Sequence, residues 1–175
     1  MSGYSIAYED EHLLVVDKGP GLVVHPARGH AQGTLSQLLA GSARGGDPER
    51  AGIVHRLDRD TSGLLVVARD EEVHRRLQRA LSKRLIERAL TGTSLLRLRL
   101  ESGRTHQIRV HLRAIGHPVC GDREYGAAGA LGLERQFLHA CRLAFDHPLS
   151  GARVDVRSPL PDDLQRALLR AERLS

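Results

Sequence analysis

The sequence predicts a domain of the α+β class, and three features of the chain support this prediction. Its 175 residues, of which 41% are hydrophobic, suit one hydrophobic core and leave little room for a second domain. Short apolar runs between turn-forming residues predict strands near both ends of the chain. Longer segments, in which apolar residues recur three and four positions apart, predict amphipathic helices. Because the chain shows no internal repeat and no linker, we expect residues 1–175 to form a single domain.

The predicted strands are short runs rich in leucine, valine, isoleucine or phenylalanine. They cover residues 6–8, 13–17, 22–24, 64–68, 95–100, 143–145 and 154–156. Residues 64–68 are apolar throughout, which is typical of a strand buried on both faces. Residues 95–100 alternate leucine with arginine from Leu96 onward, which is typical of a half-exposed strand.

Four helices are predicted, each with a residue at its start that favours helix initiation. They begin at Thr34, Asp70, Thr105 and Pro161. In the third helix Ile108, Leu112 and Ile115 share one face, which we expect to point toward the core. Gly116 should end this helix.

The charge of the chain favours a polyanionic partner, since the formal net charge is +5 and the pI is about 9.9. Of the 26 basic residues, all except Lys18 and Lys83 are arginine. The guanidinium group suits bidentate contact with phosphates and stacking on bases, as in RNA binding. A general bias of the genome toward arginine codons explains the excess equally well, so the charge alone does not decide the function.

The cysteines and the first residues predict a cytoplasmic protein. Cys120 and Cys141 lack CxxC spacing and are too few for a disulfide scaffold, so a reducing compartment is the simplest setting. The N-terminus shows no basic segment followed by an apolar one, as a secretory signal would. No apolar run approaches the length needed to span a membrane.

Residues 55–63 read His-Arg-Leu-Asp-Arg-Asp-Thr-Ser-Gly and directly precede the apolar strand predicted at 64–68. So many opposite charges beside a core strand are costly to desolvate unless each has a partner or a chemical role. A carboxylate held next to arginines at the start of a rigid strand can act as a nucleophile or an acid–base group. The alternative is a solvated turn whose polar side chains bond to their own backbone.

Arg104 and His106 lie at the start of the third predicted helix, where the helix dipole disfavours cations. An anion between them, either a phosphate or the Asp58 carboxylate, would explain this placement. The alternative is that both side chains point into solvent. A zinc site is not expected, because His106 and His111 are five positions apart and would not align on a helix.

Four blocks of the sequence resemble the RluA-type pseudouridine synthases, which isomerise uridine in ribosomal or transfer RNA. The blocks read LVVDKGPGLVVHP at 14–26, GIVHRLDRDTSGLL at 52–65, GRTHQIRVHL with GHP and GD at 103–122, and LHA with FDHP at 138–148. Together they span nearly the whole chain, and the HRLD-x-D-T-S-G run is too specific for chance to be a good explanation. The resemblance implies an α+β fold with a mixed, largely antiparallel sheet and flanking helices, and it implies that no cofactor or metal is used.

The resemblance also implies roles for individual residues. Asp58 would be the catalytic carboxylate, and Arg104 would pair with it, keep it ionised and hold its rotamer. Arg56 would help to fill the space left in the RNA when the uridine swings out. The other residues implied to bind substrate are Thr61, Gly63, His106, Gln107 and Arg109, and residues 22–25 would help to wall the pocket.

The chain departs from the family pattern in its central region. Relatives continue through several more strands between the equivalents of Arg88 and Ser94, where this chain has only residues 89–93. The family also places a tyrosine soon after a basic residue there, and alignment on Arg88 puts Leu90 at that position. Leucine offers neither a π-face nor a titratable hydroxyl, and Tyr125 is the nearest candidate to replace it. The family's N-terminal RNA-binding domain is expected to be absent, so RNA affinity would depend on arginines of this domain.

The sequence therefore predicts an RNA pseudouridine synthase that acts on ribosomal or transfer RNA, with Asp58 as the catalytic carboxylate. One alternative is a shortened relative that binds RNA but no longer isomerises it, which Leu90 and the missing strands favour. Another is that Asp58 and Asp60 act as a carboxylate pair that hydrolyses a nucleoside or glycoside. Hydrolysis would release free uracil or sugar, whereas isomerisation releases nothing.

Overall fold

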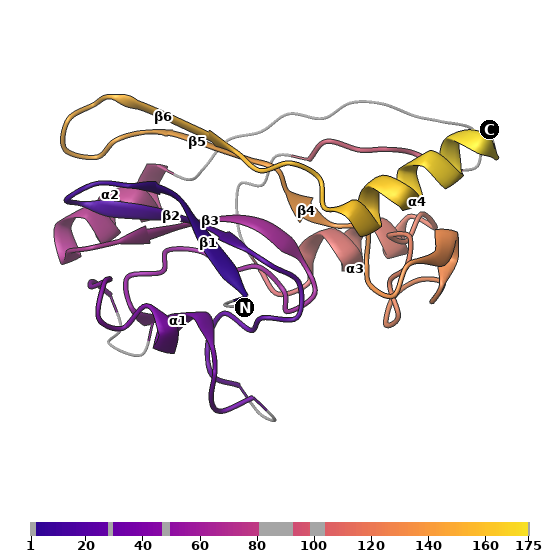
Figure 1. Ribbon diagram of the computed structural model, residues 1–175, viewed down its shortest axis with the longest axis horizontal. Coiled ribbons are helices and arrows are strands. Elements are labelled where there is room, and N and C mark those ends of the chain that lie inside the picture. The colour runs from indigo at the N-terminus through magenta and orange to yellow at the C-terminus, as the bar shows by residue number, and fades with distance from the viewer. Residues whose placement is uncertain (1–2, 28–29, 47–49, 81–92, 99–103, 175) are drawn as a thin grey trace. The chain divides into compact units, whose positions relative to one another are not determined.

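The computed structural model describes residues 3–27, 30–46, 50–80, 93–98 and 104–174. Contacts divide the chain into two compact units, whose elements are labelled in Figure 1. The first unit consists of Met1–Ala80 and His139–Pro159, and the second of Leu81–Leu138 and Leu160–Ser175. That the whole chain acts as one domain stays a prediction.

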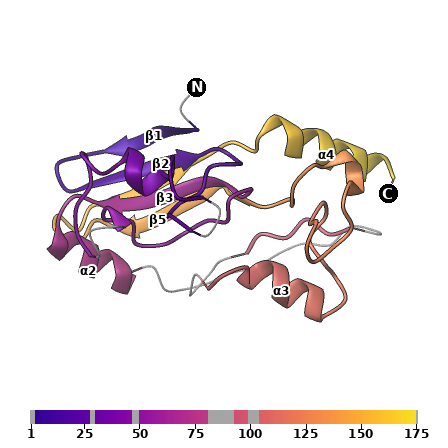
Figure 2. The ribbon, with the colours of Figure 1, turned by 90° about the horizontal axis from the view of Figure 1, so that it is seen from below.

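The first unit contains a four-stranded sheet in the order β1-β2-β3-β4. Its strands are β1 (Tyr4–Glu9), β2 (Leu13–Lys18), β3 (Ser62–Ala68) and β4 (His139–Ala140). The pairs β1–β2 and β2–β3 are antiparallel, while β3 and β4 are parallel. Figure 2 shows β1, β2 and β3 side by side. The mixed, largely antiparallel sheet and the α+β class are as the sequence analysis predicted.

The late strand pair forms an antiparallel hairpin in the same unit, with β5 at Arg142–Asp146 and β6 at Arg153–Arg157. Phe145 and Val154, which pair across the two strands, are buried, and β5 contacts β3. The exposed residues of the hairpin are mostly charged, for example Arg142 and Asp155. In β6 exposed residues alternate with buried or half-buried ones, as is typical of a strand with one face in solvent.

The core of the first unit lies around β2 and β3, because these strands have a neighbour on each side and are buried almost throughout. Leu14, Val16, Leu65 and Val67 form one apolar cluster with Leu35 of α1 (Leu35–Leu38). Burial of each large aliphatic side chain contributes about 1.5–3 kcal/mol relative to exposure. This rigid pair of strands is the support on which the loop before β3 is held.

The two predicted helices of the first unit form where their capping residues placed them. Thr34 precedes α1, and its amide donates to the Gln37 side chain at 3.1 Å. Asp70 precedes α2 (Glu71–Ala80) and accepts a hydrogen bond from the Val73 amide at 2.8 Å. Val73 and Leu77 are buried, and α2 contacts β3.

Two predicted strands are wrong. Residues 22–24 form no strand, because the carbonyls of Val23 and Val24 accept hydrogen bonds from the first amides of α1 instead of a neighbouring strand. Residues 95–98 of the run at 95–100 are also not in a strand, while residues 99–100 lie outside the described residues. Leu95 and Leu96 are 44% and 39% exposed, so the alternation is not matched by burial. A strand needs a partner, and no pairing in the described part of the chain includes these residues.

The second unit contains α3 (Gln107–Ala114), the short 3₁₀ helix η2 (Ala130–Gly132) and α4 (Asp162–Arg173). The helix predicted from Pro161 is confirmed as α4, and its Leu164 and Ala167 pack against Leu133 in a small core. The third predicted helix also forms, but its details differ from the prediction. This helix is capped by His106 instead of Thr105, and Ile115 is 66% exposed instead of facing the core.

Candidate functional site

The loop before β3 presents the predicted catalytic cluster in the first unit. It turns at Asp58, whose carbonyl accepts a hydrogen bond from the Thr61 amide at 3.1 Å. Asp58 is half-buried, Arg56 is exposed, and Thr61 is buried at the start of β3. The loop thus combines a local backbone turn, which one reading of the sequence expected, with a fixed position at the end of a core strand.

Gly63 allows the loop to approach β4 closely. Its φ is +111°, and an added Cβ would lie 2.5 Å from the carbonyl oxygen of Ala140 and 2.6 Å from its amide nitrogen. Neither backbone atom can move away without displacing β4, so only glycine fits here. Gly63, which the resemblance implies in substrate binding, therefore also has a structural reason to be glycine.

Lys18 holds the other side of the loop, although the sequence analysis gave it no role there. Its side chain is fully buried, and its Nζ donates to the carbonyls of Gly19, Leu22 and Arg59 at 2.8–2.9 Å. The Arg59 carbonyl also accepts the Gly21 amide at 2.9 Å. All three ammonium donors thus have an acceptor, which offsets part of the cost of burying the charge. Two signals in the sequence pointed to Lys18: lysine is rare among the basic residues, and Lys18 lies in the block at 14–26 that resembles the family.

The half-buried His55 makes a further contact between the loop and β3. Its Nε2 accepts a hydrogen bond from the Val66 amide at 3.2 Å. An acceptor nitrogen must be unprotonated, and desolvation lowers the pKa of His55 to about 4. The ring is therefore neutral near pH 7 and joins the loop to β3 as an acceptor.

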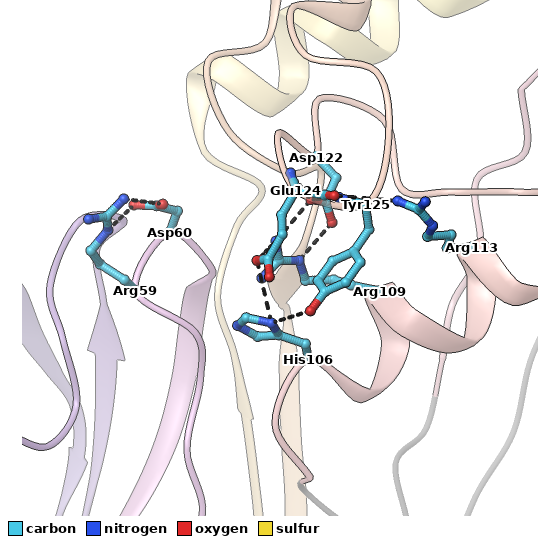
Figure 3. A network of polar contacts seen from close by, with 8 residues as sticks. All are labelled: Arg59, Asp60, His106, Arg109, Arg113, Asp122, Glu124 and Tyr125. Carbon is cyan, nitrogen blue, oxygen red and sulfur yellow. Dashed lines mark hydrogen bonds and ion pairs between the residues drawn. The ribbon is translucent and has the colours of Figure 1, made fainter. Parts of the chain in front are cut away.

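Asp60 is engaged by its neighbour. The Arg59 Nε donates to Asp60 Oδ1 at 3.1 Å, and a terminal guanidinium nitrogen donates to Oδ2 at 3.0 Å, as Figure 3 shows. The hydrogen bond to Asp60 raises the pKa of Arg59. Because both oxygens of Asp60 bind a cation, this carboxylate is poorly placed to share a reacting sugar with Asp58, which argues against the hydrolytic alternative.

A second polar cluster lies in the second unit, around the buried Arg109 (Figure 3). The guanidinium binds Asp122 in a bidentate pair at 2.7 and 2.9 Å and reaches Glu124 at 3.1 Å. Burial alone would raise the pKa of Asp122, but hydrogen bonds from Arg109 and from the amides of Tyr125 and Glu124 outweigh it and lower that pKa. Arg109 therefore fixes α3 to the loop at residues 121–126, and its assignment to the substrate stays a prediction.

Tyr125 and His106 complete this cluster. The Arg109 guanidinium lies over the Tyr125 ring at 4.8 Å from its centroid, and the Tyr125 hydroxyl is 3.1 Å from His106 Nδ1. Hydrogen bonding to Glu124 and desolvation raise the pKa of Tyr125. A phenol with a raised pKa stays protonated at neutral pH, so Tyr125 is a weak candidate for a base. Glu124 contacts Arg109 and His106, which no local pattern of the sequence indicated.

The remaining predicted residues of this unit lie at the start of α3. Arg104 is exposed, and its amide donates to the Gln107 side chain at 3.1 Å. His106 adopts a left-handed conformation with a φ of 52°. Asp58 belongs to the first unit and Arg104 to the second, so their pairing stays a prediction. Leu90 lies outside the described residues.

Two kinds of feature were not found in the described residues. No group of three or more His, Cys, Asp or Glu side chains there could hold a metal ion. None of the described helices has the length and apolar character needed to cross a membrane.

Comparison with known proteins decides the family. A family model described as RNA pseudouridylate synthase matches residues 12–89. The chain is 39% identical to the ribosomal large subunit pseudouridine synthase D of Nitrosomonas europaea, over 96% of this chain and 65% of that protein. It is 38% identical to the protein of the same name from Pseudomonas aeruginosa, over 96% of this chain and 72% of that protein. The chain belongs to the RluA-type family of RNA pseudouridine synthases.

Solved structures of pseudouridine synthase domains agree with this fold. The human RNA pseudouridylate synthase domain containing 4 matches with a TM-score of 0.59 and 20% identity, over 96% of this chain and 93% of that chain. The human domain containing 1 matches with a TM-score of 0.57 and 22% identity, over 98% and 96%. At these identities the likeness shows the fold alone.

The chain spans only part of the length of the relatives that it matches. It spans about two thirds of the length of the N. europaea protein, at 65%. Their alignment runs over 224 positions, more than the 175 residues of this chain, so the relative contains residues that have no counterpart here. The family-model match ends at residue 89, next to the region that the sequence analysis identified as shortened. That the missing residues fall in the central region of the chain stays a prediction.

Proposed function

We propose that this protein isomerises uridine to pseudouridine in ribosomal RNA, with Asp58 as the catalytic carboxylate. The observation that supports this most directly is the identity of 34–39% to ribosomal large subunit pseudouridine synthases D, together with the position of the Asp58 loop directly before the buried strand β3. Transfer RNA is a second candidate substrate.

The reaction requires the uracil to leave the sugar and return through another atom. The uridine must first swing out of the RNA, because its glycosidic bond cannot be reached while the base is stacked. The N1–C1′ bond then breaks, and the base rotates until C5 forms a new bond to C1′. A proton leaves C5 and N1 takes one up, so no atoms are gained or lost.

Asp58 is proposed to act on C1′ as the N1–C1′ bond breaks. Its carboxylate either adds to C1′ or stabilises the positive charge that develops there. Arg104 is proposed to keep Asp58 ionised and to hold its rotamer, and Arg56 to contact the RNA strand that the uridine has left. The backbone contacts made by Lys18, Gly21 and Gly63 support a fixed position for the loop that bears Asp58.

The test is chemical mapping of pseudouridine in unmodified ribosomal RNA after incubation with the protein. Wild type should form pseudouridine, and Asp58→Asn, which removes the charge and keeps the shape, should abolish it. Asp60→Asn is the matched control, since it removes a second carboxylate from the same loop and should retain activity. Loss of activity in both variants to the same extent would contradict the role of Asp58, and release of free uracil would indicate hydrolysis instead.

The second candidate function is RNA binding without isomerisation. The absence of counterparts for part of the relative favours it, together with Leu90 at the position where the family pattern has a tyrosine. Wild type that binds ribosomal RNA in a salt-dependent manner and forms no pseudouridine would support this alternative. If the missing tyrosine is the cause, Leu90→Tyr should raise the rate.

A further inference from the structure

A hydrogen-bonded chain of three residues joins the strand that follows the Asp58 loop to the end of β6. Ser62 Oγ lies 3.0 Å from His139 Nδ1, and His139 Nε2 lies 3.2 Å from the Ser158 carbonyl oxygen. A carbonyl only accepts hydrogen bonds, so Nε2 carries the proton. In the neutral ring Nδ1 is then the acceptor, and the Ser62 hydroxyl donates to it.

This chain of bonds lies where the backbone pairing is shortest. Strand β4 has two residues, and Ser62 and His139 are partners in its parallel pairing with β3. Two residues of parallel ladder provide few hydrogen bonds, so the side-chain bond between the partners adds substantially to the attachment. Ser62 is buried, which shields this bond from competing water.

We propose that His139 is a positioning residue that fixes the Asp58 loop through Ser62. The inference rests on the proposed function of Asp58. On one side the loop is held by Lys18 and Gly21, which bind the Arg59 carbonyl. On the other side Ser62 ends the loop, and His139 holds Ser62. A reacting carboxylate that shifts by about 1 Å can lose about 100-fold in rate, so both attachments matter for kcat.

Two substitutions of His139 separate the two bonds. Asparagine places a polar atom near the position of Nδ1, and glutamine places one near the position of Nε2. His139→Asn should therefore keep the bond to Ser62, whereas His139→Gln should keep only the bond to Ser158. We expect His139→Gln and Ser62→Ala to lower kcat by about tenfold or more with little change in KM, and His139→Asn to retain most of kcat.

A double variant tests whether Ser62 and His139 act together. If they do, Ser62→Ala with His139→Gln should lower kcat no further than either change alone. The matched controls are Ser36→Ala and His74→Gln, which alter a buried serine and a buried histidine elsewhere in the same unit. Both controls should leave kcat unchanged. Each rate is measured well below the Tm of the variant, so that loss of folded protein does not contribute.

The outcomes distinguish this proposal from the proposed function. Wild type that forms no pseudouridine overturns the proposed function, and the role of His139 with it. Active wild type with unchanged kcat in Ser62→Ala and His139→Gln overturns only the role of His139. Equal losses in His139→Asn and His139→Gln that follow their Tm values also overturn it, because they indicate a structural role alone. If His139→Gln does not fold, Ser62→Ala compared with Ser36→Ala decides in the same way.

Discussion

The two units hold their polar clusters by different means. In the first unit the Asp58 loop lies at the end of a buried strand, and the groups that hold it bind mainly backbone atoms, as Lys18 does with three carbonyls. In the second unit α3 is largely exposed, and its one buried residue, Arg109, is bound to the carboxylates of Asp122 and Glu124. The first cluster thus depends on the sheet, and the second depends on pairs of charged side chains.

This difference predicts different responses to substitution and pH. A backbone carbonyl stays in place when the side chain of its residue is replaced. In the first cluster, therefore, we expect substitutions to lower stability mainly where they change a side chain that binds the backbone, such as Lys18. A buried ion pair is sensitive at both partners, because removal of one leaves the other charge buried without compensation. The experiments below test this contrast, from the largest expected effect to the smallest.

Asp122→Ala should have the largest effect on stability. It removes the buried bidentate partner of the Arg109 guanidinium, while the carboxylate of Glu124 is half exposed, and it removes the acceptor of two loop amides. We expect a loss of about 3–5 kcal/mol in the free energy of unfolding, measured by urea denaturation. Hydrogen exchange should accelerate at the amides of α3 and remain slow in β2 and β3. Equal acceleration in both units would contradict the contrast between them.

Lys18→Met should have the next largest effect, and in the other unit. The methionine fills most of the volume but donates no hydrogen bond, so the carbonyls of Gly19 and Leu22 lose their Lys18 donor and that of Arg59 keeps only the Gly21 amide. We expect a loss of about 2–3 kcal/mol by urea denaturation, together with reduced pseudouridine formation. Unchanged activity with reduced stability would show that the Asp58 loop keeps its position without this lysine.

The pH dependence of stability should reveal His55. The pKa of this residue is lowered to about 4 in the folded protein, from 6.5. Below about pH 6.5 the unfolded chain binds a proton that the folded protein does not, so stability should fall as the pH drops toward 4 and then level off. Because part of the residue is exposed, we expect a loss of about 2 kcal/mol instead of the full value for this shift. His55→Gln should flatten this part of the profile, and a profile that is unchanged by the substitution would contradict the assignment.

Arg142→Ala should have the smallest effect. Arg142 pairs with Asp155 across the β5–β6 hairpin, but both side chains are substantially exposed to solvent. Exposed ion pairs are screened by water and salt and contribute little to stability. The urea midpoint should therefore stay close to that of wild type. A shift as large as that expected for Asp122→Ala would mean that burial is not what distinguishes the two pairs.

The sequence was sufficient to predict most elements of the fold, because their local patterns agree with their burial. The run at residues 64–68 became the buried strand β3, and Asp70 and Pro161 marked the starts of α2 and α4. The strands predicted at 22–24 and 95–100 fail for a common reason. An apolar or alternating pattern shows that a segment suits a sheet, but it does not show that a neighbouring strand is available.

The candidate site was predicted in part for a similar reason. Its contiguous motif could be recognised, and it places Asp58 in a short loop and Gly63 in the strand β3 that directly follows. The groups that hold this loop are distant in sequence: Lys18 binds a carbonyl 41 residues away, and His139 lies 77 residues from Ser62. Such contacts arise from the pairing of strands, which no short stretch of sequence encodes. The pairing of Asp58 with Arg104 would likewise join residues far apart in the sequence, and it stays a prediction.

His106 shows that the backbone and the side chain at one position can have opposite requirements. Its φ of 52° is one that glycine or asparagine would adopt more readily, and for other residues it costs about 1 kcal/mol or more. Yet glycine would remove the imidazole that contacts Tyr125 and Glu124. Replacement by glycine should thus relax the start of α3 while releasing the tyrosine, and replacement by asparagine would offer a compromise. Designers who wish to stabilise this protein should treat residue 106 as a trade-off instead of a defect.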